Sequence, residues 1–262
     1  MNSDTVFDVR SVSYAYEGKQ TALDDISLTL CAGESLVILG ANGCGKSTLL
    51  KLLDGLYFPT QGSISAFGQA LTEEALRDDE YNFAFRRRVG LVFQDSDVQL
   101  FSPSVLDEVA FAPLQLGISR AEVNKRVDSA LKALRIEKLR DRAPHRLSGG
   151  EKRRVALASL LTLQPEVWLM DEPTTGLDPR SQSWLVEFIA EQRKLGKTLI
   201  TATHDLAFAE EIASKIYVFS EEHRIAASGE PADILSDHEL LHRCNLSHYH
   251  ARSSQQASAP SH

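Results

Sequence analysis

The chain has 262 residues and a formal net charge of −8, and hydrophobic residues make up 43% of it. This balance is typical of one large globular domain, or of a domain with a subdomain, and it excludes global disorder. The acidity argues against a dedicated duplex-DNA protein, because such proteins carry a basic footprint.

The sequence shows no export or membrane signal. No apolar run approaches the ~18–20 residues that cross a bilayer, and the first ten residues lack a basic segment followed by an apolar one. The three cysteines, Cys31, Cys44 and Cys244, lie far apart and indicate neither a disulfide framework nor a zinc site. We therefore expect a chain that is not exported and stays in a reducing compartment.

Short apolar runs alternate with helical patterns, which predicts an α/β fold around a largely parallel sheet. The predicted strands are Val9–Tyr14, Ser35–Leu39, Val89–Phe93, Val167–Met170, Thr198–Ala202 and Ile216–Phe219. Apolar residues recur at helical spacing in two sets, Val123, Val127, Ala130, Leu131 and Leu134, and then Trp184, Leu185, Phe188 and Ile189 before a stop at Gly196. Residues 96–161 contain no clear strand and predict a mostly helical insertion, and a polar tail with no apolar period follows Leu246.

A glycine-rich loop follows the second predicted strand. The run from Gly40 to Thr48 fits G-x-x-x-x-G-K-[ST], with an apolar strand before it and a helical pattern after it. In such a loop, backbone N–H groups and the helix N-terminus bind phosphate oxygens. Lys46 is then expected to reach the β- and γ-phosphates, and Ser47 to bind Mg²⁺. The predicted nucleotide-binding residues here are Gly40, Ala41, Asn42, Gly43, Cys44, Gly45, Lys46, Ser47 and Thr48.

Cys44 is an unusual residue within this loop. The positive local field could lower the pKa of its thiol, or the side chain could be a small filler without a role. In either case we expect that alkylation of Cys44 blocks nucleotide binding by its bulk.

Two carboxylates end the strand that begins at Val167. Beside a phosphate loop, Asp171 is expected to join the Mg²⁺ site. Glu172 would then lie near the γ-phosphate and act as general base on the attacking water.

A third motif, Leu147-Ser148-Gly149-Gly150-Glu151, precedes a helical pattern. Ser148 can cap that helix, and the glycines expose backbone N–H groups, so this is a second anion-binding helix N-terminus. With the two motifs above, it makes the chain resemble the ATP-binding subunit of an ABC transporter from about Val6 to Ile234.

The resemblance implies the reaction and the cofactors. In this family the protein hydrolyses ATP to ADP and phosphate with Mg²⁺, and two subunits pack head to tail. Ser148, Gly149, Gly150 and Glu151 would cover the ATP bound to the partner subunit. The fold implied is a P-loop (RecA-like) core with an antiparallel β subdomain and a helical subdomain.

Further residues match family elements one by one. Gln94 matches the Q-loop glutamine, which contacts Mg²⁺ and links to the membrane partner, and His204 matches the switch histidine near the γ-phosphate. Asp178 matches the D-loop at the dimer interface. Tyr16 matches the aromatic that stacks on adenine, although Tyr14 is a close competitor.

These assignments divide the chain into four parts. Residues 1–95 and 162–222 would form the ATP-binding core with the N-terminal β subdomain, and 96–161 the helical subdomain. Residues 223–246 would be a C-terminal extension, and 247–262 a flexible tail that carries histidines.

The segment from Phe93 to Gly117 resembles the ATPases of energy-coupling-factor importers, although Asp95, Ser96 and Ala112 depart from the usual pattern. Ser104 has the form of a helix cap in this segment. The residues expected to offer an apolar surface to an integral membrane subunit, or to belong to the core, are Val105, Leu106, Val109, Phe111 and Leu114.

Five histidines lie near the C-terminus: His238, His242, His248, His250 and His262. The first two share a helix face if that segment is helical, and such imidazoles can bind Ni²⁺, Co²⁺ or Zn²⁺. The alternative is a solvated tail with incidental histidines. Similar tails occur in cobalt and nickel importer ATPases, which favours these ions as the cargo.

We therefore expect an ATPase on the cytoplasmic face of the membrane, bound to integral membrane transport subunits and paired with itself or a related ATPase. It would power import of cobalt or nickel without binding nucleic acid. One alternative is a vitamin importer. Another is a soluble ABC ATPase of DNA repair or ribosome function, which the short single-domain length and the missing basic stripe disfavour.

Overall fold

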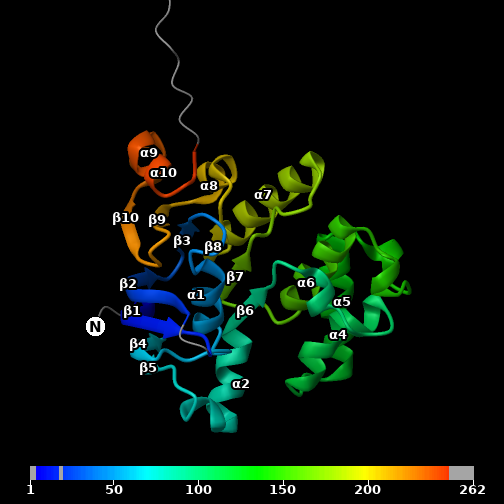
Figure 1. Cartoon of the computed structure of the whole chain (residues 1–262). Coiled ribbons are helices and arrows are strands. Elements are labelled where there is room, and N and C mark those ends of the chain that lie inside the picture. Colours follow the sequence, from blue (N-terminus) through cyan, green and yellow to red (C-terminus); the bar gives the residue numbers. More distant parts are fainter. Residues whose placement is uncertain (1–3, 18–19, 248–262) are drawn as a thin grey trace, which may run out of the picture.

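The computed structural model describes residues 4–17 and 20–247. Two sheets and a helical lobe lie side by side (Figure 1). The larger sheet is parallel except at one edge, where β10 runs antiparallel to β9. Its strands in spatial order are β10 (Ile225–Gly229), β9 (Lys215–Phe219), β3 (Ser35–Leu39), β8 (Thr198–Thr203), β7 (Val167–Asp171) and β6 (Val89–Val92).

The smaller sheet is antiparallel. Its strands in spatial order are β2 (Thr21–Cys31), β1 (Thr5–Ala15), β4 (Gln61–Ala66) and β5 (Gln69–Ala70). The helices around the two sheets are α1 (Lys46–Leu53), α2 (Asp79–Arg88), α7 (Pro179–Lys194), α8 (Leu206–Ile212), α9 (Pro231–Ser236) and α10 (His238–Arg243).

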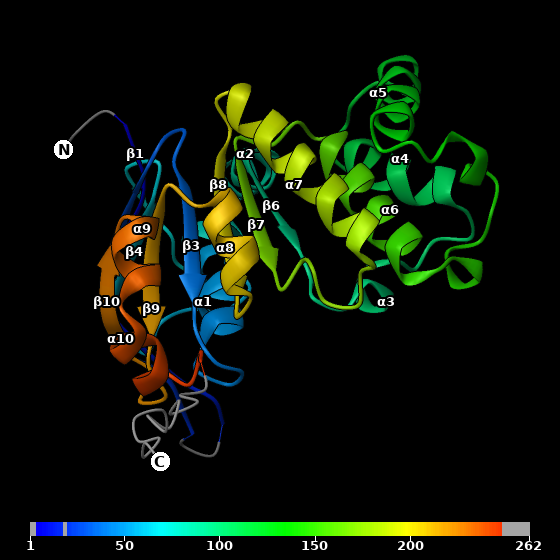
Figure 2. The same ribbon diagram turned by 90° about the horizontal axis from the view of Figure 1, so that it is seen from above.

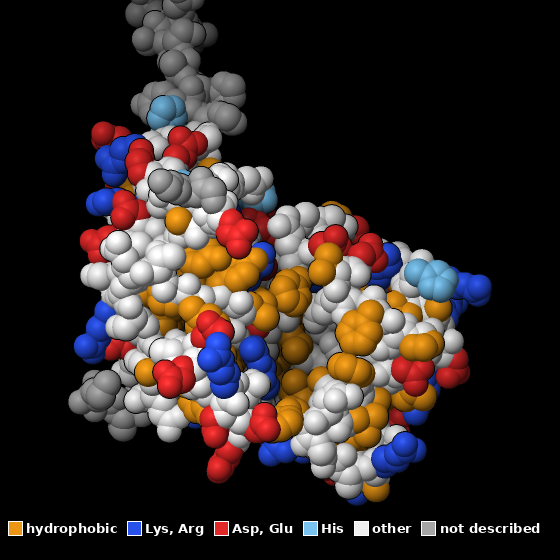
Figure 3. Space-filling model, turned by 60° about the horizontal axis from the view of Figure 1, so that its bottom comes forward, with side chains coloured by type: hydrophobic (Ala, Val, Ile, Leu, Met, Phe, Trp, Pro, Cys, Tyr) orange, Lys and Arg blue, Asp and Glu red, His pale blue; other side chains and the backbone are white. Residues whose placement is uncertain are grey.

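The helical lobe lies beyond α7, on the side of the large sheet away from α9 and α10 (Figure 2). It contains α3 (Ser96–Gln99), α4 (Val105–Gln115), α5 (Arg120–Ala133) and α6 (Gly149–Leu161). Seen from below, hydrophobic side chains gather in the hollow between this lobe and the sheets (Figure 3). Within the residues described above, no helix is both long and apolar enough to span a membrane.

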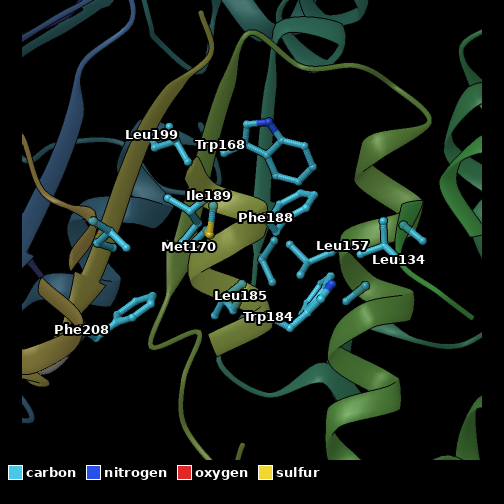
Figure 4. Packing of buried hydrophobic residues seen from close by; sticks show 14 of the residues in the cluster. Leu134, Leu157, Trp168, Met170, Trp184, Leu185, Phe188, Ile189, Leu199 and Phe208 are labelled. Atoms are coloured by element: carbon cyan, nitrogen blue, oxygen red, sulfur yellow. The ribbon is translucent and has the colours of Figure 1, made fainter. Parts of the chain in front are cut away.

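Both faces of the large sheet are buried, which explains its continuous apolar strands. Along β3, Leu36 and Ile38 face the small sheet and α1, whereas Val37 and Leu39 face α7 and the helical lobe. On the second face, Trp168 of β7 meets the Phe188 ring of α7 edge-on, with centroids 5.4 Å apart (Figure 4). This packing holds α7 between the sheet and the helical lobe.

The six predicted strands and both predicted helices are present, and the α/β prediction is confirmed. Four strands were not predicted: β2, β4, β5 and β10. In β2, Asp24 and Asp25 interrupt the apolar alternation, and Asp25 has φ +52°, so the strand is irregular where it pairs with β1. The others are short or carry few apolar residues.

Candidate functional site

The phosphate loop joins β3 to α1. Gly45 has φ +109°, and a Cβ there would lie 2.2 Å from the Ala22 carbonyl oxygen, so only glycine fits. Lys46 begins α1 and is buried, and its ammonium group donates to the carbonyl oxygens of Gly40 (2.7 Å) and Ala41 (3.0 Å). The loop thus presents a buried cation at the C-terminal end of a parallel strand, where α/β sheets bind ligands.

Glu172 lies between two basic groups directly after β7. Its Oε1 is 3.2 Å from Lys46 Nζ, and its Oε2 is 2.9 Å from His204 Nδ1, which follows β8. The Glu172 side chain is 4% exposed, whereas that of His204 is 51% exposed. The backbone of Glu172 has φ +42°, a strained conformation that clusters at functional sites.

Oxygen donors for a divalent cation lie next to this carboxylate. Ser47 Oγ donates to Asp171 Oδ1 at 2.9 Å, and Gln94 lines a cavity together with Ser47 and Glu172. Burial raises the pKa of Asp171, while the Ser47 hydrogen bond and the charge of Lys46 oppose the rise. A hydroxyl, a carboxylate and an amide oxygen are the kind of donors that Mg²⁺ prefers, so the residues present fit that ion.

The cavity at the phosphate loop has a volume of about 370 Å³. Tyr16 lines it, and its hydroxyl is 2.9 Å from Thr48 Oγ1. Tyr14 is not among the lining residues and instead stacks on Tyr57, with centroids 5.4 Å apart. Of the two candidate tyrosines, Tyr16 is therefore the one that lines the cavity. The lining consists of Tyr16, Gln20, Thr21, Ala22, Asn42, Gly43, Gly45, Lys46, Ser47, Thr48, Gln94, Glu172 and His223.

The environment of Cys44 bears on the two alternatives for its thiol. The residue is 2% exposed, and burial raises the pKa of its thiol, which outweighs the lowering by Lys46. The buried thiol agrees with the alternative of a small filler rather than with a thiol activated by the local field. The thiol instead packs against Gly40, where a Cβ would lie 2.6 Å from Cys44 Sγ.

The Ser148 motif begins α6 as predicted. Ser148 Oγ accepts from Glu151 N at 3.3 Å, and Glu151 Oε2 accepts from Ser148 N at 2.8 Å, which is a reciprocal capping box. The hydrogen bonds that Ser148 N and Ser148 Oγ donate to Glu151 Oε2 lower the pKa of the Glu151 carboxyl. Asp178 caps α7 nearby, and its Oδ1 accepts from Ser181 N at 2.9 Å.

Ser148, Gly149 and Gly150 of this motif line a separate cavity of about 610 Å³. Asp178 lines the same cavity. That cavity and the one at the phosphate loop have no lining residue in common. Within one chain, the two predicted anion sites are therefore apart.

Arg153 connects the two regions and was missed by sequence reasoning. It lies on α6, is 3% exposed, and its guanidinium donates to the carbonyl oxygens of Phe93 and Gln94 (2.6 Å for Gln94). The neighbouring Lys152 pairs with Asp97 of α3. The helix that begins at the Ser148 motif is thus hydrogen-bonded to the loop that carries Gln94. A buried arginine within a polar run gives no sequence signal of such a contact.

The predicted apolar surface on α4 is partly core. Val105 and Val109 are fully buried, and Leu106 is partly buried, whereas Phe111 and Leu114 are about two-fifths exposed. Val98 and Phe101 add to the exposed set at 73% and 67%. The Phe101 and Phe111 rings meet edge-on, with centroids 5.0 Å apart. Ser104 caps α4 as predicted, and its hydroxyl accepts from Asp107 N.

The C-terminal histidines divide into two groups. His238 and His242 lie on α10 and are exposed, so the predicted shared helix exists. His248, His250 and His262 lie outside the described residues. Within the described part of the chain, no group of three or more His, Cys, Asp or Glu side chains could hold a metal ion.

Comparisons with known proteins agree with this geometry. The family model described as ABC transporter matches residues 23–175. The nickel import ATP-binding protein NikO of Rhodobacter capsulatus is 49% identical over 92% of this chain and 95% of its own length. The cobalt import ATP-binding protein CbiO of the same organism is 46% identical over 88% of this chain and 81% of its own length.

A solved structure extends the likeness to the fold. The ATP-binding cassette MJ0796, a dimer in a post-hydrolysis state bound to ADP and Pi, is 27% identical with a TM-score of 0.77. The match covers 86% of this chain and 98% of that one.

Proposed function

The chain belongs to the ABC transporter family, and we propose that it is the ATP-hydrolysing subunit that powers an energy-coupling-factor importer of nickel or cobalt ions. Domains of this family bind ATP and are ATPases.

The observation that carries the proposal is the position of Glu172 between Lys46 and His204. A buried carboxylate after a strand can accept a proton from water that attacks the γ-phosphate. Lys46 and His204, each within 3.2 Å of that carboxylate, would stabilise the charge on the transferring phosphoryl group. Ser47, Asp171 and Gln94 would hold Mg²⁺, which neutralises charge on the β- and γ-phosphates.

A second copy, or a related ATPase, would complete the site. Because the Ser148 cavity and the phosphate-loop cavity share no residue, one chain does not place both on the same phosphate. Head-to-tail pairing would bring the Ser148 cavity of one chain to the phosphate-loop cavity of the other. The related cassette MJ0796 is a dimer. Asp178, next to the Ser148 motif, would lie at the interface.

The exposed apolar side chains support a membrane partner. Phe83 of α2 is 48% exposed and, with Leu116 and Gly117, lines a cavity of about 520 Å³ beside the end of α4. Four more of the exposed apolar side chains lie on or between α3 and α4: Val98, Phe101, Phe111 and Leu114. Hydrophobic side chains fill the hollow that Figure 3 shows between the lobes. An exposed apolar region of this kind marks a protein interface, and we assign it to the cytoplasmic face of an integral membrane transport subunit.

The cargo assignment depends on the relatives. NikO and CbiO are nickel and cobalt import proteins by name, and both align with nearly the whole chain. The alternative is the same ATPase role in a vitamin importer, since cargo is chosen by the membrane subunit in such importers.

Uptake of labelled Ni²⁺ and Co²⁺ by cells of the source organism tests the proposal, with the chromosomal copy changed to Glu172→Gln and a labelled vitamin as comparison. We expect metal uptake to fall and vitamin uptake to persist. Loss of vitamin uptake alone would move the chain to the vitamin importers. Unchanged uptake of both cargoes would overturn the transport role.

A further inference from the structure

His223 lies in the tight turn between β9 and β10, which is fixed onto β2. His223 N donates to Ser220 O at 3.1 Å, and the His223 carbonyl accepts from Asp24 N at 3.0 Å. Arg224 adds two hydrogen bonds to Asp24 Oδ2, at 2.8 and 2.6 Å. The position of this turn relative to the start of β2 is therefore well defined.

The residue carries two energetic costs that the described part of the chain does not offset. Its φ is +63°, in the left-handed region that favours glycine or asparagine. Its Nδ1 is buried and has no hydrogen-bond partner among the described residues. Most buried polar atoms in proteins have a hydrogen-bond partner, and a ligand in an adjacent cavity can supply one for this nitrogen. The same side chain lines the cavity of the phosphate loop.

The location within that cavity indicates which part of a nucleotide is near. Lys46 and Ser47 fix the triphosphate end. The other lining residues outside the phosphate loop and the catalytic carboxylate include Tyr16, Thr21 and Ala22. Thr21 and Ala22 belong to β2, the strand whose Asp24 is hydrogen-bonded to His223. The phosphate loop touches this strand directly, because a Cβ on Gly45 would contact the Ala22 carbonyl. His223 is therefore among the lining residues that the triphosphate does not engage and that remain to contact the nucleoside.

The chemistry of imidazole matches that of a nucleoside. A neutral imidazole has one donor and one acceptor nitrogen. A purine edge and the ribose hydroxyls present both donors and acceptors. We propose that His223 hydrogen-bonds the nucleoside part of bound ATP and thereby strengthens and selects nucleotide binding. This inference rests on the proposed ATP-binding function of the same cavity.

Replacement by glycine separates a ligand contact from a turn-forming role. His223→Gly removes the imidazole and places glycine, which tolerates a positive φ, in the turn. If His223 only shapes the turn, the variant should be as stable as the parent or more stable, and it should bind ATP equally well. A residue that contacts the nucleoside gives a different result. We expect an unchanged or raised Tm and an ATP Kd weakened by about 3- to 10-fold, the loss of one hydrogen bond.

The assay is titration calorimetry with Mg²⁺ on the full chain, using ATP, GTP and inorganic tripolyphosphate. Glu222→Gln, an exposed neighbour in the same turn, is the matched control and is expected to bind ATP like the parent. Tripolyphosphate lacks the nucleoside, so His223→Gly should not change its binding. A changed ratio of the ATP and GTP Kd values places the contact on the base, and an unchanged ratio with both weakened places it on the ribose.

Two results would overturn the inference. One is an ATP Kd in His223→Gly equal to that of the parent, and the other is a tripolyphosphate Kd weakened as much as that of ATP. Lys46→Ala reports separately on the proposed function. If the parent fails to bind ATP, or if Lys46→Ala binds it equally well, the nucleotide site itself is wrong.

Discussion

Asp54 at the end of α1 gives a pH-dependent prediction that follows directly from the structure. Its carboxyl is 10% exposed, and Arg86 of α2 donates to its Oδ2 at 3.2 Å and to its backbone oxygen at 2.6 Å. Burial raises the pKa of Asp54 from 3.8 to about 7, although the charge and hydrogen bond of Arg86 lower it. The folded chain therefore holds a proton on Asp54 at pH values where the unfolded chain has released it.

The sign of the effect follows from proton linkage. Below pH ~4 both states are protonated, and above pH ~7 both are ionised. Between these values the folded state binds more protons, so the Asp54 contribution lowers the free energy of unfolding as the pH rises. At about 1.4 kcal/mol per pKa unit, the two units between pH 5 and pH 7 correspond to about 3 kcal/mol.

Asp54→Asn isolates this contribution because asparagine keeps an acceptor oxygen for Arg86 and cannot ionise. Urea unfolding at pH 5, 6, 7 and 8 should show the stability advantage of the variant growing by about 3 kcal/mol from pH 5 to pH 8. Glu73→Gln is the control, because the ion pair of Glu73 with Arg77 is largely exposed and should give no such trend. A difference between Asp54→Asn and the parent that stays constant over this range would refute the reasoning, since the carboxylate would then be ionised throughout.

Further predictions concern the site and its connections. Glu172→Gln should lower ATP hydrolysis by about 100-fold or more and leave the ATP Kd within twofold, by steady-state assay and calorimetry; hydrolysis at the parent rate would remove Glu172 as the base. Ser148→Ala should reduce hydrolysis without changing ATP binding to the single chain, and weaker single-chain binding would place Ser148 in its own nucleotide cavity. Arg153→Met keeps the aliphatic stem but leaves two backbone carbonyls unpaired, so the free energy of unfolding should fall by about 2–4 kcal/mol. The kcat should also fall while KM for ATP changes little, and an unchanged kcat would leave Arg153 a structural residue only. Iodoacetamide should label Cys31 before Cys44, because Cys44 is buried with a raised thiol pKa, and its alkylation should abolish ATP binding; rapid labelling of Cys44 with binding intact would contradict both points.

The parts of the fold that the sequence predicts are those with a strong local period. Trp184, Leu185, Phe188 and Ile189 lie on one buried face of α7, and Ser35–Leu39 is a strand buried on both faces. The irregular β2 and the short edge strand β10 have no such period. Their places depend on pairing with β1 and β9, the strands just before them in the chain, in registers that contain shifts.

The contrast between local sequence patterns and tertiary contacts also applies to the residues of the site. Lys46, Asp171 and Glu172 belong to short motifs with fixed spacing, and in the structure Lys46 contacts Glu172 while its neighbour Ser47 contacts Asp171. Arg153 and His223 belong to no such motif. Their positions follow from tertiary contacts, to the Gln94 loop for Arg153 and to β2 for His223.

A mixing experiment tests most directly whether the nucleotide site is shared between two chains. Lys46→Ala breaks the phosphate loop and Ser148→Ala breaks the covering motif, so each variant alone should hydrolyse little ATP. In a mixed dimer one of the two sites combines an intact Lys46 with an intact Ser148, so an equal mixture should regain up to about a quarter of parent activity. Activity in the mixture equal to the mean of the two separate variants would contradict the shared site.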